Sequence, residues 1–228
     1  MRVVVDAVSK GRRGEALGQT SLTFESGHAR FVRTETEQRP AVLGLIASGR
    51  MRPDTGTVTI DGDASPKELR RRVALVDAPD VNDPPPNVTV TGVVGEELMF
   101  AGLPATPVHA RRWLKQTGFP DVAAQPISTV DPHVRVRILC ELAALREGVE
   151  GIVLVSPDRH GGGPEGWWRI AAELAERGLA LLVIIGSAAA EVIARMPETA
   201  ADHLAEATAD DPDPAADTEE PETEGEIR

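Results

Sequence analysis

One short run of residues has the types that acyl-transfer chemistry uses. His160 is followed by Gly161, Gly162 and Gly163, and consecutive glycine N–H groups can stabilise a developing oxyanion. That chemistry also needs a nucleophilic serine in a Gly-x-Ser-x-Gly turn, and the sequence contains none. The run therefore predicts a flexible turn rather than an esterase site.

The other residues that ligate metals or act as nucleophiles are scattered along the chain. The histidines show no i, i+3 or i+4 spacing and only one cysteine is present, so no zinc site is predicted; the histidines are His28, His109, His133, His160 and His203. Cys140 lies in a helical run and has no partner for a disulfide within the chain. We therefore expect a reducing compartment.

Charge is distributed very unevenly along the 228 residues. The formal net charge is −12, and the range Ala201 to Arg228 holds eleven Asp or Glu and one Arg (a net −10), so about −2 remains for the rest of the chain. No basic nucleic-acid face or polybasic membrane patch is apparent. The composition of 201–228 predicts a disordered, solvating acidic tail.

Apolar content is 41%, aromatic content is 3% and tyrosine is absent, so the core must be mainly aliphatic. The N-terminal apolar run is too short for a signal peptide. The longest later run, Leu179 to Ile185, is far short of the roughly 18 residues that cross a bilayer. We expect a cytoplasmic protein with no direct membrane insertion.

The first half of the chain predicts strands followed by a helix, a turn and a strand. Alternation over Val3 to Val5, Ser21 to Phe24 and Ala29 to Val32 predicts an antiparallel entry sheet. The stretch Pro40 to Asp63 predicts a short helix starting at its proline, a turn at 52–56, and a strand over 57–60 that buries its two aliphatic side chains. A capping box over Ser65 to Glu68 precedes a basic helical turn.

The second half predicts helices first and then an alternation of strands and helices. Helices are expected from Thr91, over 106–118 and over 131–145; strands over 73–76, 152–155 and 179–185 alternate with helices over 164–177 and 188–196. Continuous apolar strands separated by helices are typical of a parallel sheet covered on both faces. Adjacent helical residues point about 100° apart, so Trp167 and Trp168 predict one tryptophan in the core and one at its edge. Arg70, Arg71 and Arg72 predict a solvated helix face.

The order of these pieces resembles the ATP-binding subunit of an ABC transporter. The segments that carry the resemblance are SLTFESGHARFV, SGRMRPDTGTVTIDG, ELRRRVALV, HVRVRILCELAAL and ELAERGLALLVII, and the resemblance covers Arg2 to Met196. It implies an α/β, P-loop-NTPase-like ABC ATPase fold over 1–200. It also implies a mostly parallel core sheet, an N-terminal antiparallel β piece and a helical subdomain at about 88–145.

The catalytic motifs of that family are not present at the matching positions. A phosphate loop needs glycines, a lysine and a hydroxyl, whereas here Pro40 stands where the lysine belongs and the loop positions contain no glycine. The nine positions are Thr34, Glu35, Thr36, Glu37, Gln38, Arg39, Pro40, Ala41 and Val42. Two glutamates place like charge near any phosphate, so the segment predicts a structural turn.

The remaining motif positions are altered as well. Val155 and Ser156 occupy the Walker B acidic positions, followed by Pro157 and by Asp158, which we expect to cap or solvate the turn. The signature position holds Asp131, Pro132, His133 and Val134; Ala78 stands at the glutamine position, Gly186-Ser187 at the histidine position, and no aromatic residue for adenine lies in Lys10 to Arg13. No catalytic, cofactor-binding or metal-binding set is intact, and ATP with Mg²⁺ is expected only if the family activity survives.

These residues lead to one interpretation and two alternatives. The first is a non-hydrolysing accessory or regulatory partner of a transport complex, at the inner face of the membrane through a permease subunit or an intact ABC ATPase. The second is one half of a heterodimeric ABC ATPase whose activity needs an intact partner, and the third is a soluble non-catalytic scaffold. Met99 and Phe100 are candidate contacts to a membrane subunit, with ordinary packing as the alternative, and a dimer is a further candidate state.

Overall fold

A four-stranded parallel sheet forms the centre of the computed structural model, which describes residues 1–34 and 39–196. Its strand order is β3-β7-β6-β5. The strands are β3 (Ala29–Arg33), β5 (Val73–Val76), β6 (Gly151–Val155) and β7 (Ala180–Ile185). Each pairs with its neighbour in parallel. The parallel sheet predicted from the alternating second half is therefore confirmed.

Both faces of this sheet are buried because successive side chains point to opposite sides. In β7, Leu181, Val183 and Ile185 belong to one apolar core, whereas Leu182 and Ile184 belong to the other. This double burial explains why the strand sequence is continuously apolar rather than alternating.

A separate three-stranded antiparallel sheet has the order β2-β1-β4. It consists of β1 (Arg2–Lys10), β2 (Leu17–Glu25) and β4 (Thr55–Ile60). The prediction that Ala29 to Val32 belongs to an antiparallel entry sheet was wrong, because β3 pairs in parallel with β7. Phe31 and Val32 are both buried, one in each core, so this strand needs cover on both faces.

Seven helices surround the sheets in the described part of the chain: α1 (Pro40–Ala47), α2 (Pro66–Arg72), α3 (Val90–Phe100), α4 (Pro107–Gln116), α5 (Pro132–Ala144), α6 (Pro164–Glu176) and α7 (Ser187–Ala194). Most begin at a proline, which wastes no backbone donor in the first turn. Side chains of Ser65, Thr89, Thr106 and Asp131 accept hydrogen bonds from the first-turn N–H groups of α2, α3, α4 and α5. These cap signals explain why the helix starts could be predicted from the sequence. None of the described helices has the length and apolarity needed to cross a membrane.

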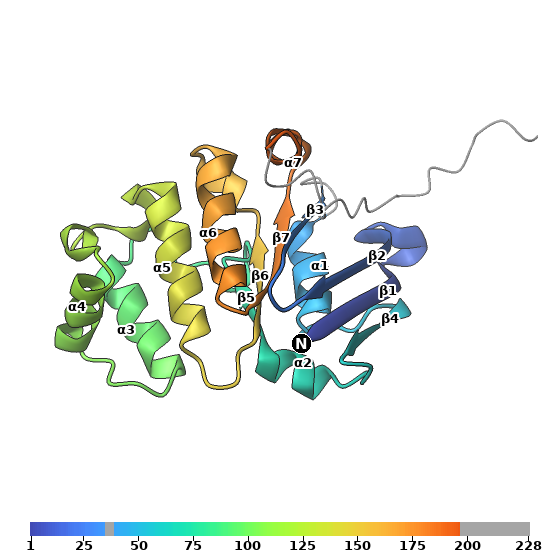
Figure 1. Ribbon diagram of the computed structural model, residues 1–228, viewed down its shortest axis with the longest axis horizontal. Coiled ribbons are helices and arrows are strands. Elements are labelled where there is room, and N and C mark those ends of the chain that lie inside the picture. The colour runs from blue at the N-terminus through green and yellow to red at the C-terminus, as the bar shows by residue number, and fades with distance from the viewer. Residues whose placement is uncertain (35–38, 197–228) are drawn as a thin grey trace, which may run out of the picture.

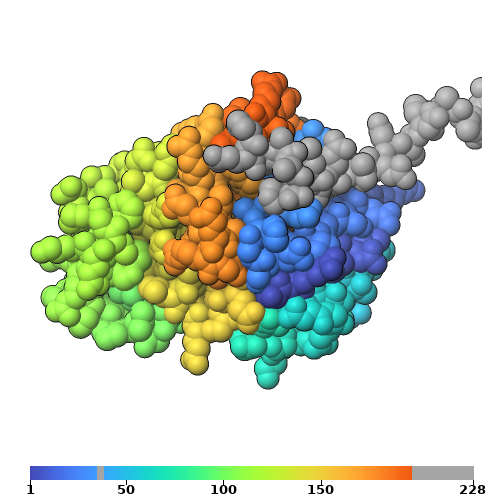
Figure 2. Space-filling view, in the orientation of Figure 1, coloured from blue at the N-terminus to red at the C-terminus, as the bar shows by residue number. Residues whose placement is uncertain are grey.

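The elements form successive layers (Figure 1). Helix α1 lies between the antiparallel sheet and one face of the parallel sheet, and α5 and α6 cover the other face. Helices α3 and α4 lie outside α5, at the end of the molecule opposite β1 and β2 (Figures 1 and 2). The order of layers thus separates a helical end from a β-rich end.

Two glycines explain the close approaches in the stretch Pro40 to Asp63. A Cβ on Gly44 would lie 2.8 Å from Cγ2 of Val155, so α1 can pack directly onto β6. Gly56 has φ +72°, and a Cβ there would lie 2.3 Å from a backbone oxygen of β1. The strand begins at Thr55 rather than at the predicted Thr57, and Ile60 is buried whereas Val58 is only partly buried.

Both tryptophans pack in the core, so the second lies deeper than the predicted edge position. Trp167 and Trp168 have 0% and 5% exposed surface. Trp168 packs edge-on against Phe31, with 5.7 Å between the ring centroids. Of the three arginines in α2, Arg72 is not solvated but pairs with Asp61 at 2.8 Å and with a second carboxylate before β6.

Candidate functional site

The candidate site lies at the carboxyl edge of the parallel sheet. All four strands end there, and in α/β proteins ligands bind in the crevice outside these ends. The residues that follow the strands are Thr34 after β3, Asp77 after β5, Ser156 after β6 and Gly186 after β7. The resemblance places the phosphate loop and the Walker B position at this same edge.

At the phosphate-loop position, Thr34 is buried and its N–H donates to the carbonyl of Ile185 at 2.8 Å. Arg39 precedes α1 in the left-handed region with φ 48° and provides no side-chain cap. Pro40 begins the helix without an N–H, and the N–H of Val42 donates to the carbonyl of Arg39 at 2.8 Å. Residues 35–38 of the predicted loop lie outside the described residues. The start of α1 therefore offers few of the free donors that hold a phosphate.

At the Walker B position, Val155 is fully buried and Ser156 adopts the left-handed region with φ 47°. The N–H of Ser156 donates to the carbonyl of Ile184 at 2.8 Å. Asp158 was expected to cap or solvate its own turn, but its Oδ2 accepts from the N–H of Gly186 at 3.2 Å. Its Oδ1 is buried and has no hydrogen-bond partner among the described residues. Asp158 thus connects the ends of β6 and β7.

At the signature position, Asp131 caps the first turn of α5. Its carboxylate accepts from the N–H groups of His133 and Val134, at 2.9 and 3.3 Å. Nε2 of His133 lies 2.9 Å from the carbonyl oxygen of Gly163. The first turn of α5 is therefore bonded to its own cap and to the loop before α6, with Pro132 supplying no donor.

A buried ion cluster, which the sequence did not predict, connects these pieces. Asp77 is almost fully buried, and its carboxylate accepts from Nη2 of Arg135 at 2.6 Å and from Nη2 of Arg159 at 3.1 Å. Nε2 of His160 lies 2.9 Å from the other oxygen. Arg159 also donates to the carbonyls of Asp77 and Val155. We call Asp77, Arg135, Arg159 and His160 the Asp77 network.

The electrostatics of the network favour an ionised aspartate. Burial alone would raise the pKa of Asp77, but hydrogen bonds from His160 and Arg135, with the charges of Arg135 and Arg159, lower it below the ordinary value. Burial raises the pKa of the nearby Cys140 thiol, and the charge of Asp77 raises it further. An ionised carboxylate whose two oxygens are hydrogen-bonded to Arg135, Arg159 and His160 has little capacity left to accept a hydrogen bond from a ligand.

The network could not be predicted from the sequence because its members are distant in the chain. Asp77 lies 58 positions from Arg135 and 82 from Arg159. The available signals were an acidic residue directly after an apolar strand and an arginine near the start of a helix whose neighbours are apolar. Neither signal identifies the partner without the strand order. Among the described residues no group of three or more His, Cys, Asp or Glu is placed to hold a metal ion.

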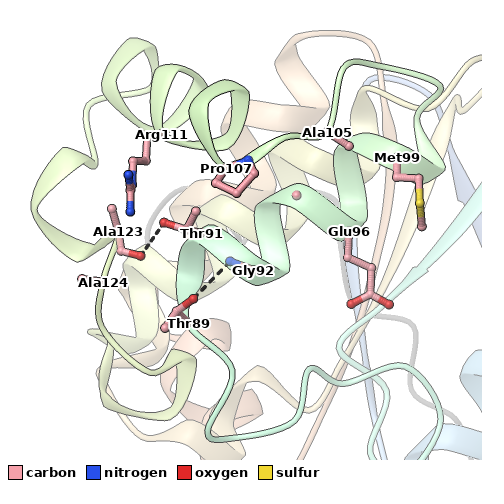
Figure 3. A pocket seen from close by; sticks show the side chains of 11 residues that line it. Thr89, Thr91, Gly92, Glu96, Met99, Ala105, Pro107, Arg111, Ala123 and Ala124 are labelled. Atoms are coloured by element: carbon pink, nitrogen blue, oxygen red, sulfur yellow. Dashed lines mark hydrogen bonds between the residues drawn. The ribbon is translucent and has the colours of Figure 1, made fainter.

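A second surface lies at the helical end of the molecule. A groove with a volume of about 570 Å³ runs between α3, α4 and the segment before α5, and Thr89, Gly92, Glu96, Met99 and Arg111 are among its lining residues (Figure 3). Four large apolar side chains of α3, α4 and the loop between them are exposed, and Met99 among them lines the groove: Met99 58%, Phe100 58%, Leu103 42% and Val108 63%. We call these four residues the α3–α4 patch. Met99 and Phe100, predicted as candidate contacts, are therefore on the surface rather than in the core.

Comparison with solved structures identifies the fold. The chain matches an ABC transporter ATP-binding protein from Pyrococcus furiosus with a TM-score of 0.59 and 13% identity, over 82% of this chain and 92% of that one. CbiO1 from Clostridium perfringens, part of the ABC transporter complex CbiONQ, matches with a TM-score of 0.55 and 15% identity, over 81% and 77%. A bacterial ABC transporter cassette solved as a dimer matches with a TM-score of 0.57 and 18% identity, over 81% and 87%.

These likenesses establish that the chain has the fold of ABC transporter ATP-binding cassettes, as the order of segments predicted. No protein-family model matches the sequence, and none of the curated proteins matches it. Because sequence identity to these structures is 13–18%, the similarity shows the fold alone. The chemistry of the site follows from the residues of this chain.

Proposed function

We propose that the chain is a non-hydrolysing accessory or regulatory subunit of a transport complex, built on the ATP-binding cassette fold. One observation carries the proposal: except for Oδ1 of Asp158, the buried carboxylate oxygens of Asp77 and Asp158 at the carboxyl edge are hydrogen-bonded within the chain. Asp77 is hydrogen-bonded within the Asp77 network, and Asp158 accepts a hydrogen bond from Gly186. Both side chains lie at the edge where a cassette binds the phosphates of its nucleotide.

The chemistry of phosphoryl transfer supports this proposal. Catalysis needs cationic and N–H donors around the phosphates, oxygen ligands for Mg²⁺ and a group that orients the attacking water. Pro40 provides neither a cation nor an N–H, Val155 provides no metal ligand, and Ser156 replaces the acidic residue that polarises water. The residues present therefore do not fit ATP with Mg²⁺ and supply none of the groups that a hydrolytic step requires.

The α3–α4 patch supports assignment to a complex. Exposed large apolar side chains on neighbouring elements, beside a groove that Glu96 and Arg111 also line, are typical of a protein contact. The patch belongs to α3, α4 and their connecting loop, which form the end of the molecule opposite the β-rich end (Figure 1). A partner bound to this end would contact the helices rather than the antiparallel sheet. We infer that the partner is a membrane permease subunit, which would place the chain at the cytoplasmic face of the membrane.

Calorimetric titration of the full chain with Mg-ATP tests the absence of catalysis. We expect no saturable binding in the micromolar range and no phosphate release above the buffer rate, while an intact ABC cassette measured in parallel gives both. Micromolar binding coupled to turnover by the isolated chain would overturn the proposal.

Co-purification tests the partner. The chain should be co-expressed with the permease or the intact ATPase encoded beside it, if such a gene is present. Met99→Asp with Phe100→Asp should lower recovery of the complex at least tenfold, whereas Gln19→Asp on the exposed side of β2, at the other end of the molecule, should leave it unchanged. Equal recovery for both variants would contradict the use of the α3–α4 patch.

The same complex separates the two alternatives. In a heterodimeric ATPase this chain would contribute its α5 start to the partner's phosphate site, and ATP turnover would disappear when the chain is omitted. An accessory subunit changes the transport rate but leaves the partner's ATP turnover measurable without it. If the chain is a soluble scaffold, no membrane protein co-purifies.

A further inference from the structure

A second groove lies at the opposite, amino edge of the parallel sheet. It has a volume of about 960 Å³ and is lined by the residues after α1, the turn before β4, and one side of α2. Helix α1 starts at the carboxyl edge, so its last turn reaches the amino edge, where β4 and α2 lie beside it (Figure 1). The groove is therefore distinct from the edge at which a cassette binds nucleotide.

Three arginines line this groove, and none has a carboxylate partner among the described residues. Nη1 of Arg50 donates to the carbonyl of Ser48 at 3.0 Å and to that of Val73 at 2.9 Å. Nη1 of Arg70 donates to the carbonyl of Gly49 at 2.9 Å. The side chain of Arg52 is exposed, and its guanidinium makes no hydrogen bond or ion pair with any described residue. Each guanidinium keeps donors available for a ligand, because a guanidinium has five.

Five arginines elsewhere in the described part pair with carboxylates: Arg71 with Glu68, Arg72 with Glu150, Arg137 with Glu173, Arg146 with Glu97 and Arg177 with Glu141. The single carboxylate among the described residues that line the groove is Asp54, and Lys10 occupies it at 2.6 Å. The three arginines of the groove therefore have backbone carbonyls or no partner, and no carboxylate of the described residues neutralises them.

Burial makes the positive charge of Arg50 less favourable. Arg50 is partly buried, and its pKa is lowered first by burial and then by the positive charges of Arg146 and Arg70. A partly buried cation whose close neighbours are cations is an unfavourable arrangement for the protein alone. A bound anion would relieve it, and such perturbed groups in a cleft mark candidate binding sites.

We propose that this amino-edge groove is a binding site for a phosphate-bearing ligand. Guanidinium groups match phosphate oxygens through paired hydrogen bonds, and Arg50, Arg52 and Arg70 all line the one hollow. Met51 and Val58, which are partly buried, also line the groove and accommodate an apolar part of the ligand. The phosphate belongs either to a soluble phosphate ester or to a lipid head group.

Calorimetric titration of the full chain with inorganic pyrophosphate tests the site. We expect saturable binding at one site per chain. Arg52→Gln, which removes a guanidinium without a partner in the described residues, should weaken it about tenfold, and Arg52→Gln with Arg70→Gln should abolish it. Arg112→Gln, on the exposed face of α4 at the far end of the molecule, should leave the affinity unchanged. Urea midpoints of all variants report whether the fold is retained.

Co-sedimentation with vesicles that contain a third phosphatidylserine separates the two sources. Sedimentation that pyrophosphate reverses and that Arg52→Gln weakens assigns the site to a lipid head group. Pyrophosphate binding with no sedimentation assigns it to a soluble ligand. Absence of both, or equal pyrophosphate affinity for wild type and Arg52→Gln, would overturn the proposal.

Discussion

Removal of the Asp77 carboxylate should be strongly destabilising. In Asp77→Ala, Arg135 keeps a guanidinium whose side chain is 4% exposed, and removing one partner of a buried ion pair costs about 3–5 kcal/mol. For chains of this size a change of 1 kcal/mol shifts the melting temperature by roughly 2–4 °C. Thermal unfolding of the full chain followed by circular dichroism should therefore show a melting temperature lowered by about 6–20 °C.

A matched control and a rescue separate the network from general effects of charge removal. Asp83 lies 3.5 Å from Arg159 and its side chain is 35% exposed, so Asp83→Ala should change stability by less than about 1 kcal/mol. The double variant Asp77→Leu with Arg135→Met should unfold at a higher temperature than Asp77→Ala. It removes both members of the buried pair, so no guanidinium at position 135 is left without its carboxylate. Equal melting temperatures for Asp77→Ala and Asp83→Ala would refute the reasoning.

Three other perturbations test individual contacts. Gly56→Ala should destabilise the chain by well over 1 kcal/mol in urea unfolding, because it combines a positive φ with a backbone clash, whereas Gly62→Ala, with a positive φ and open space, should cost about 1 kcal/mol. Cys140 is buried and its thiol pKa is raised, so a thiol reagent at pH 8 should react only after denaturation. The folded-state pKa of Asp77 is lowered, so the ionised carboxylate stabilises the folded chain fully above about pH 4 and progressively less as acid protonates it. Asp77→Asn should therefore reduce the loss of stability at acid pH.

Most of the fold could be predicted from local chemistry. Prolines at helix starts, the caps Ser65, Thr106 and Asp131, and the apolar strands of the second half predicted element positions to within a few residues. The strand pairing of Ala29 to Val32 was misassigned, because pairing depends on which faces other segments cover. A strand of five residues carries no local signal that identifies the strand beside it.

The candidate site was less predictable than the fold. Residue spacing located the strand ends and the motif positions, but it assigned Asp158 to its own turn and treated Arg70 to Arg72 as one solvated face. Asp158 bonds across to Gly186, and Arg72 pairs with Asp61. Such contacts depend on which strands are adjacent in the sheet, and this information is absent from residue spacing.

The two edges of the parallel sheet differ in whether their charges are satisfied. At the carboxyl edge, Asp77 is saturated by Arg135, Arg159 and His160, so a ligand there would have to break buried contacts. At the amino edge, the guanidinium of Arg52 makes no hydrogen bond or ion pair with a described residue that a ligand would need to displace. Binding is favoured where donors are preorganised but unpaired. Electrostatics therefore favours anion binding in the amino-edge groove over anion binding at the edge that cassettes use for nucleotide.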